Sequence, residues 1–217
     1  MPMPFRLRQL CFLKLNCKRT EHYWALQVFY EMENMNVFIC LLRGINVSGK
    51  NIIKMNALRS SFEKLGAQNI QTYIQSGNVV FQHPETETAD LEKRITDQVL
   101  SDFGLVVPVM VLNKEQLQKI VSKNMFATEA IKEISSLYVT FLSGKPLADG
   151  LKSVASFKAE HEQISFSDEA VYLYCPKGYG KTKLNNNLLE NKLKVQATTR
   201  NWKTTLKLLE MASQYYS

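Results

Sequence analysis

The sequence has no apolar run approaching the roughly 18 residues that a helix needs to cross a bilayer. Gly and Pro are scarce, with 9 and 6 copies in 217 residues. The first absence argues against a membrane protein, and the second, with no low-complexity tract, argues against disorder over most of the chain. The short apolar run at 10–13 ends at Lys14. The apolar core of a secretory signal spans about 7–15 residues, so we do not interpret this run as a signal peptide. What remains is a chain that is 45% hydrophobic and long enough to bury a real core.

Residues that usually carry catalysis or bind metals are also few. The three histidines, His22, His83 and His161, stand alone, and the four cysteines have no zinc-type spacing. We therefore predict no metal site and no cofactor, and cysteines that stay reduced fit a cytoplasmic location. Cys175, close to the start of a predicted helix, is open to two interpretations: a thiol of lowered pKa, or a small buried apolar side chain, which is the more common case.

Basic residues concentrate in two separate segments. The formal net charge is +7, and residues 35–64 and 177–217 hold five and eight basic residues against one and two acidic ones. Residues 65–176 between them hold nine basic and 14 acidic residues. The two basic segments either form one positive patch, if the fold brings them together, or are two solvated helix faces. A patch would favour an anionic partner.

Apolar periodicity predicts the order strand, helix, strand, strand, helix, strand in residues 35–113. The runs 35–42 and 105–112 are apolar at consecutive positions, which is typical of strands buried on both faces. Gly66 ends the first helix, and a Ser-Gly turn joins two β-rich runs into a hairpin. The predicted elements are strand 35–42, helix 55–65, strands 70–74 and 79–81, helix 88–103 and strand 105–112.

The same order returns in residues 136–217, after a linking helix within residues 114–135. The repeated β-α-β-β-α-β order predicts an α+β fold of two ferredoxin-like subdomains in one compact unit, plus a C-terminal helix. Residues 1–34 show no period, and we interpret them as an extension outside this unit, disordered or the product of an early start. The predicted elements of the second subdomain are strand 137–142, helix 147–157, strands 163–166 and 170–175, helix 184–193, strand 194–198 and helix 201–212.

The loop at residues 43–51 matches the phosphate-binding pattern G-x-x-x-x-G-K-[ST] at every position except the last. It also follows a strand and leads to a helix, as that motif requires. Asn51 stands at the position of the hydroxyl that binds magnesium, and no acidic Walker B partner follows an apolar strand. A P-loop ATPase is therefore disfavoured, whereas a simpler anion-binding loop and an ordinary turn both remain open. The candidate residues of this secondary loop are Arg43, Gly44, Asn46, Gly49 and Lys50.

A second loop, at residues 175–183, contains Gly-Lys-Thr but lacks the first glycine of the motif, and Pro176 removes one backbone N–H. Taking the first and third strands of a ferredoxin-like sheet as parallel neighbours, we expect this loop to meet the Ser-Gly-Lys turn at 143–145. Arg200 offers a planar guanidinium suited to phosphate, and Trp202 offers a ring for stacking or, more commonly, for the core. The predicted anion site is Lys145, Gly180, Lys181, Thr182, Lys183, Arg200 and Trp202.

Three tyrosines on the predicted strands of the second subdomain allow a different surface. Tyr172 and Tyr174 point away from the face of Leu173, and Tyr138 is expected on the same face of the neighbouring strand. An RNA-recognition sheet stacks bases on such aromatics, but the glycine-and-aromatic signature of that module is absent. Packing of these rings against the other half is the favoured interpretation.

Two long stretches of the chain resemble a known family. LLRGINVSGKNIIKMNALRSSFEKLG, followed by TYIQSGNVVF, is similar to the N-terminal signature of domain of unknown function 1697. YGKTKLNNNLLENKLKVQATTRNWKTTLKLLEMA is similar to its C-terminal signature, and together the stretches span residues 35–212. The resemblance implies a cytosolic bacterial protein with an α+β fold of ferredoxin-like elements, and it implies no catalytic residues.

The sequence thus favours binding of a phosphate-bearing ligand, a nucleotide or nucleic acid, through the basic C-terminal region. The first alternative is an enzyme that acts on a small anionic substrate, with Lys181, Lys183 and Arg200 stabilising its charge. The second alternative is a module that binds another protein through an exposed face. No membrane contact is expected, and the sequence leaves the oligomeric state open.

Overall fold

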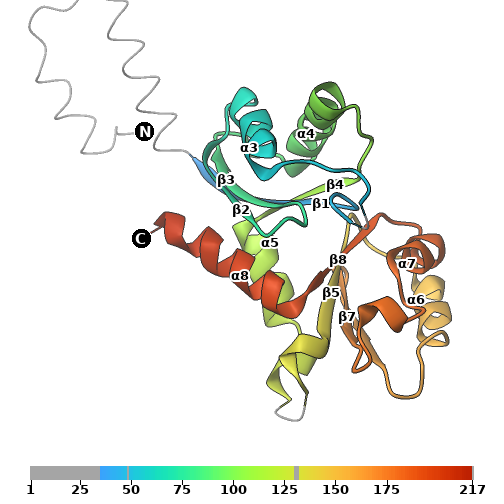
Figure 1. Ribbon diagram of the computed structural model, residues 1–217. Helices are drawn as coiled ribbons and strands as arrows, with labels where there is room; N and C mark the ends of the chain where they lie inside the picture. The colour runs from blue at the N-terminus through green and yellow to red at the C-terminus, as the bar shows by residue number, and fades with distance from the viewer. Residues whose placement is uncertain (1–34, 48, 130–131, 217) are drawn as a thin grey trace, which may run out of the picture. The chain divides into compact units, whose positions relative to one another are not determined.

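The first half of the structure is a four-stranded sheet with two helices on its outer face. The computed structural model describes residues 35–47, 49–129 and 132–216, so the extension expected at 1–34 lies outside the described residues (Figure 1). The strands follow the order β2-β3-β1-β4, and each neighbouring pair is antiparallel. The elements are β1 (Asn36–Leu42), α3 (Met55–Lys64), β2 (Gln68–Tyr73), β3 (Asn78–His83), α4 (Thr88–Phe103) and β4 (Val109–Asn113).

Strand β1 is buried on both faces, because its side chains alternate between two apolar clusters. Val37, Ile39 and Leu41 point into one cluster, whereas Phe38 and Cys40 point into the other, which packs under α3 and α4. All five residues are at most 2% exposed. The expectation of a strand buried on both faces is confirmed, and it explains why consecutive positions are apolar.

The second half repeats the arrangement of the first. Its sheet has the order β6-β7-β5-β8, again with antiparallel neighbours. A capping box of Asn113 and Gln116 starts the helix that connects the halves. The elements are α5 (Lys114–Ser122), η2 (Met125–Thr128), η3 (Ile134–Ser136), β5 (Leu137–Leu142), α6 (Ala148–Ala155), β6 (Gln163–Phe166), β7 (Ala170–Tyr174), η4 (Tyr179–Lys181), α7 (Asn186–Leu193), β8 (Ala197–Asn201), α8 (Trp202–Ser213) and η5 (Gln214–Tyr216).

Helices α5 and α8 lie between the two sheets and join the halves through one core (Figure 1). This central cluster contains Ile39 and Met110 from the first sheet, Val139 and Tyr172 from the second, and Leu208 from α8. Helices α3 and α4 cover the outer face of the first sheet, and α6 and α7 cover that of the second. Each sheet would expose an apolar face without the other half, and Asn36–Ser217 accordingly form one compact α+β unit.

Two strands begin three or more residues later than the sequence predicts, each for a local backbone reason. The strand expected at 105–112 begins only at Val109, because Pro108 has no N–H to donate to a neighbouring strand. The strand expected at 194–198 is shifted to Ala197–Asn201, because Lys194 adopts a left-handed conformation (φ 59°) that ends α7. Helix α4 has the predicted bounds, Thr88–Phe103, and Gly104 ends it with φ 66°.

The buried His83 makes the fold sensitive to acid. The Nδ1 atom of His83 accepts the N–H of Glu85 at 3.0 Å, and Nε2 lies 3.2 Å from the carbonyl oxygen of Leu65. A neutral ring with its proton on Nε2 satisfies both contacts, and burial lowers the pKa of His83. An unfolded histidine has a pKa of about 6.5. The unfolded state therefore takes up the proton first as the pH falls, and stability is lost below that pH.

We expect the melting temperature to fall as the pH is lowered from about 7 to about 5.5. His83→Asn should flatten this dependence, because the variant has no imidazole to protonate, although it should also lower the melting temperature at neutral pH. The same substitution at the exposed His161 is the matched control and should leave the pH dependence unchanged. Thermal unfolding followed by circular dichroism tests this, and an equally steep pH dependence in His83→Asn would refute it.

Candidate functional site

The two lysine loops of the second half lie at opposite ends of its sheet. Strands β5 and β7 are antiparallel, with Leu137 opposite Tyr174 and Phe141 opposite Ala170. The loop after β5 therefore leaves one end, and the loop after β7 leaves the other, roughly 17 Å away along the strand. The expectation of parallel strands and converging loops is wrong, because the hairpin reverses the third strand of each half against the first. Lys145 and Lys181 do not share a site.

Arg200 lies buried at the junction of the halves, with all five of its N–H donors in use. The residue is 9% exposed, and burial lowers the pKa of Arg200 to about 10, which still leaves it charged at neutral pH. A guanidinium without a spare donor fixes the chain segments around it and has none left for a phosphate. The acceptors, at 2.5 to 3.2 Å, are Oδ1 of Asn78, Oγ1 of Thr198 and the carbonyl oxygens of Thr199, Leu42 and Ser76.

A second arginine, Arg43, crosses the same junction from the first half. Its Nη1 donates to the carboxylate of Glu190 on α7, and to the carbonyl of Ala197 at 2.9 Å. The same carboxylate accepts the N–H of Ala197, the first residue of the edge strand β8, at 2.9 Å. This contact brings the first basic segment against the second, but the arginine at the contact is neutralised by a carboxylate.

Other candidate residues of the 43–51 loop stabilise the conformation of the loop itself. Both of its glycines have φ of 74°, and Asn46 has φ of 53°, a left-handed conformation that glycine and asparagine tolerate best. The Nδ2 of Asn46 donates to the carbonyls of Ile53 and Gln75, both at 2.9 Å, which ties the loop to the β2–β3 hairpin. Of the secondary candidates, Lys50 keeps an exposed side chain. The hydrogen bonds of Asn46 therefore give this loop a structural role at the end of β1.

The loop between β7 and α7 carries three exposed lysines. Lys177, Lys181 and Lys183 are exposed, and within the part of the chain that the structure describes none of their ammonium groups makes an ion pair or hydrogen bond. Helix η4 ends at Lys181, and α7 begins only at Asn186, so this lysine does not open a helix as the lysine of a P-loop does. A side chain at Gly180 would meet nothing within 4 Å, so a ligand can approach the backbone there.

Two other predicted site residues serve the local structure and the core. Thr182 is 9% exposed, and its Oγ1 accepts the N–H of Leu184 at 3.1 Å. Trp202 is 3% exposed and belongs to the central cluster, where it acts as a core anchor. Burial raises the pKa of the Cys175 thiol to about 12, so the interpretation of this cysteine as a reactive thiol is wrong.

The tyrosines of the second sheet are divided between its two faces. Tyr172 is 1% exposed, packs in the central cluster and donates a hydrogen bond of 2.8 Å to a carbonyl of α5. Tyr138 lies opposite Leu173 and therefore points to the outer face, where its ring centroid is 5.3 Å from that of Tyr179. The expectation that Tyr138 shares a face with Tyr172 and Tyr174 is wrong, so these rings do not form a stacking surface of the RNA-recognition type.

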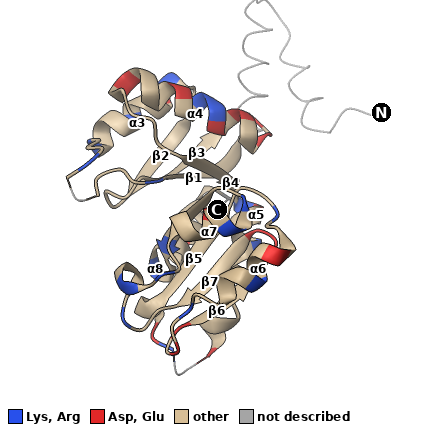
Figure 2. Cartoon of the chain, turned by 90° about the vertical axis from the view of Figure 1, so that its right-hand side faces the viewer, with Lys and Arg blue, Asp and Glu red and all other residues tan. Residues whose placement is uncertain are grey.

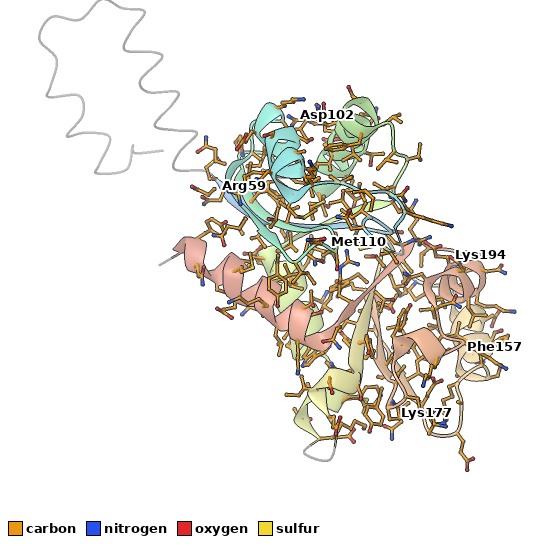
Figure 3. All side chains as sticks on the ribbon, in the orientation of Figure 1. Arg59, Asp102, Met110, Phe157, Lys177 and Lys194 are labelled. Atoms are coloured by element: carbon orange, nitrogen blue, oxygen red, sulfur yellow. The ribbon has the colours of Figure 1, made fainter. Side chains whose placement is uncertain are left out.

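Charged residues occur mainly in the helices and loops, and the strands contain few of them (Figure 2). Figure 3 shows Lys194, which follows α7, beside the first half, and Lys177 at the far end of the second half. Lys194 and Lys177 therefore lie in different regions of the second half, and the 177–183 loop lies away from the junction. Among the described residues, no group of three or more His, Cys, Asp and Glu side chains is placed to hold a metal ion.

None of the helices in residues 35–47, 49–129 and 132–216 has the length and apolar character needed to cross a membrane.

Comparison with known proteins identifies a family and a similar structure. No curated protein matches this chain. The structure of the conserved bacterial protein SP0830 from Streptococcus pneumoniae is similar, with 24% identity and a TM-score of 0.65, over 82% of this chain and 99% of that chain. At this identity the similarity concerns the fold alone.

A family model described as protein of unknown function (DUF1697) matches residues 35–172. This range includes the first signature stretch, whereas the second stretch, at 179–212, lies beyond the match. The chain belongs to the DUF1697 family.

Proposed function

We propose that this protein binds a phosphate-bearing ligand, a nucleotide or nucleic acid, through the loop between β7 and α7. One observation carries the proposal: Lys177, Lys181 and Lys183 are exposed within seven consecutive residues and have no acidic partner among the described residues. Unpaired like charges this close together raise the local positive potential and attract anions. A phosphate held by two or three of these groups would gain about 1.5–3 kcal/mol for each charge-assisted hydrogen bond.

The loop is anchored in a way that supports a preorganised site. The hydroxyl of Tyr179 lies 3.0 Å from Oγ1 of Thr199 on β8 and donates to Oδ1 of Asn186 on α7 at 3.4 Å. Its ring packs on Tyr138. The exposed Gly180, next to this anchor, leaves the backbone open to a phosphate oxygen. A ligand would therefore meet lysines that project from a fixed loop.

The proposed site differs from the one that the sequence predicted. Thr182, Arg200 and Trp202 are buried, and Lys145 lies at the other end of the sheet, so these four residues are removed from the site. Lys177 is added to Gly180, Lys181 and Lys183. The enzyme alternative has less support than binding, because it depended on a converging set of lysines and Arg200 as charge stabilisers.

The lysine loop can be tested by anion binding in a charge-matched pair of variants. We expect Lys181→Ala/Lys183→Ala to weaken binding of a labelled single-stranded oligonucleotide about tenfold or more, measured by fluorescence anisotropy at low salt. The slope of log K against log salt should fall by about 1.4, since each phosphate contact to a single strand contributes about 0.7. Nucleotide binding, measured by thermal shift with ATP, should weaken in the same variant.

Lys93→Ala/Lys152→Ala is the control, because it removes the same charge from exposed positions on α4 and α6. An equal loss in this control would attribute binding to net charge and contradict a site on the loop. A loss confined to Lys50→Ala/Lys54→Ala would place the site on the first basic segment instead. All these side chains are exposed, so the melting temperatures without ligand should match that of the wild type.

We also propose that each half is a ferredoxin-like subdomain, with boundaries at 35–113 and 136–217 and with 114–135 as the link. The identical element order and the identical strand order of the two sheets support this. The free, buried thiols of Cys40 and Cys175 support a reducing compartment, and we place the protein in the cytoplasm.

A further inference from the structure

A cavity of about 270 Å³ opens between the two halves, at the end of the second sheet opposite the lysine loop. Residues of β4 and α5 form one wall, the segment after β5 forms another, and the β6–β7 turn forms the third. Sites for drug-sized ligands usually measure roughly 300–1,000 Å³, so this cavity suits a small molecule. The cavity is lined by the apolar Leu112, Ile120 and Leu142 and by the polar Gln116, Lys145, Asp168 and Glu169, among others.

One side of the cavity is apolar. Leu112, Ile120 and Leu142 line it and are at most 7% exposed, so their side chains are fixed by the surrounding core. An aliphatic group that lay on them would remove apolar surface from water, at about 25 cal/mol for each Å². The cavity therefore favours a ligand that has an aliphatic portion.

The opposite side carries charges of both signs with unused bonding capacity. The Nζ of Lys145 lies 3.7 Å from Oδ1 of Asp168, which is longer than a hydrogen bond. The Oε1 of Glu169 accepts from Lys119 at 2.6 Å. Its Oε2 is buried, accepts no hydrogen bond from the described residues and has the ammonium of Lys123 at 3.8 Å. The cavity lining thus presents the ammonium of Lys145, the carboxylate of Asp168 and one unbonded oxygen of Glu169, a carboxylate that Lys119 and Lys123 approach from outside the lining.

Gln116 adds a neutral donor whose orientation is fixed. Its Oε1 accepts the N–H of Asn113 at 2.9 Å as part of the capping box that starts α5. The amide nitrogen on the other side of the group donates to no residue that the structure describes. A side-chain amide held by one oxygen leaves two N–H donors available to a ligand in the cavity.

We propose that this cavity binds a free α-amino acid with an aliphatic side chain. The ammonium group of the ligand would lie between Asp168 and Glu169, and its carboxylate would lie on Lys145 and the amide of Gln116. The side chain of the ligand would lie on the apolar wall. The terminal torsion of a glutamate is soft, so Oε2 of Glu169 can turn toward an incoming ammonium group. Neighbouring charges of opposite sign match the two ends of a zwitterion.

The test is calorimetric titration of the full-length chain with L-leucine, L-isoleucine and L-valine. We expect at least one of them to bind at millimolar concentration or below. Blocking either charged end should weaken binding about tenfold, a change of 1.4 kcal/mol, so N-acetyl-L-leucine and L-leucinamide are the matched probes. Glu169→Gln and Lys145→Ala should each weaken binding of the free amino acid to a similar extent.

Lys152→Ala, on the exposed side of α6, is the control variant and should bind as the wild type does. The side chain of Lys145 is 79% exposed, so Lys145→Ala will fold even if Glu169→Gln does not. Absence of binding by all three amino acids would overturn the proposal, and so would equal binding of the blocked compounds or unchanged binding by Lys145→Ala. Lys181→Ala/Lys183→Ala should bind the amino acid normally, which separates this outcome from that of the lysine loop.

Discussion

Replacing Arg200 by Met is expected to lower the free energy of unfolding by about 3–4 kcal/mol. The guanidinium connects the end of β1 and the β2–β3 hairpin to β8, so three of its five hydrogen bonds join the two halves and the other two stay within β8. Methionine fills a similar volume but donates no hydrogen bond, and it leaves Oδ1 of Asn78 and the carbonyl of Leu42 without this partner. A buried acceptor left unsatisfied costs about 1–3 kcal/mol. Equilibrium urea unfolding measures the change.

Two further substitutions separate the contribution of the buried network from that of an arginine in general. Arg94→Met removes an exposed side chain with one hydrogen bond, of 2.9 Å to the carbonyl of Leu65, and should cost less than about 1 kcal/mol. Arg200→Lys keeps the charge but loses the planar fork, so it should recover only a small part of the loss. A change below about 1 kcal/mol in Arg200→Met would show that the junction does not depend on this side chain.

Replacing Gly150 by Ala is expected to lower the free energy of unfolding by about 2–3 kcal/mol. In most helices this substitution is favourable by about 1 kcal/mol, because alanine has the higher helix propensity. Here the added Cβ would lie 2.2 Å from the carbonyl oxygen of Lys192 and 3.4 Å from Cα of Leu193. Both contacts are to backbone, so α6 and α7 must separate, and the loss of packing exceeds the gain in propensity.

The matched control is Gly180→Ala, because a Cβ at that position would meet nothing within 4 Å. Its free energy of unfolding should change by less than about 0.5 kcal/mol. Denaturant unfolding of both variants gives the comparison. If Gly150→Ala were as stable as the wild type, the close approach of α6 to α7 would be contradicted.

The order and type of the elements could be predicted from the sequence, because local patterns determine them. Consecutive apolar residues in β1 reflect two clusters that meet on one strand, and Val37 and Phe38 face different clusters. The periodicity of α4 predicted its bounds because Gly104 ends the helix in a left-handed conformation. The strand boundaries were less accurate, since Pro108 and Lys194 act through backbone geometry that apolar periodicity does not report.

The candidate site was harder to predict, because it depends on contacts between distant parts of the chain. Nothing in the residues around Arg200 shows that its acceptors include Leu42 and Ser76, more than 100 positions away. A guanidinium suits a phosphate and a cluster of carbonyl oxygens equally well, so the residue type does not decide between them. The direction of the third strand could have been derived, since a hairpin must reverse the chain, and this would have separated Lys145 from Lys181.

The residues of the amino-acid cavity carried no signal of their own in the sequence. Gln116 is part of a helix cap, and Asp168 and Glu169 belong to a hairpin turn, where polar residues are expected without any function. Their proximity follows from the packing of α5 against the second sheet, which periodicity does not predict. Two acidic residues next to a turn are informative only once the fold has placed Lys145 beside them.

Hydrogen–deuterium exchange with and without a single-stranded oligonucleotide tests the location of the anion site most directly, because it reports on each loop separately. At low salt, the oligonucleotide should slow exchange in peptides that cover residues 175–187 and leave peptides that cover 43–54 unchanged. The Lys181→Ala/Lys183→Ala variant should lose this protection. Protection confined to 43–54, or no protection at 175–187 at saturating oligonucleotide, would contradict a phosphate-binding loop after β7.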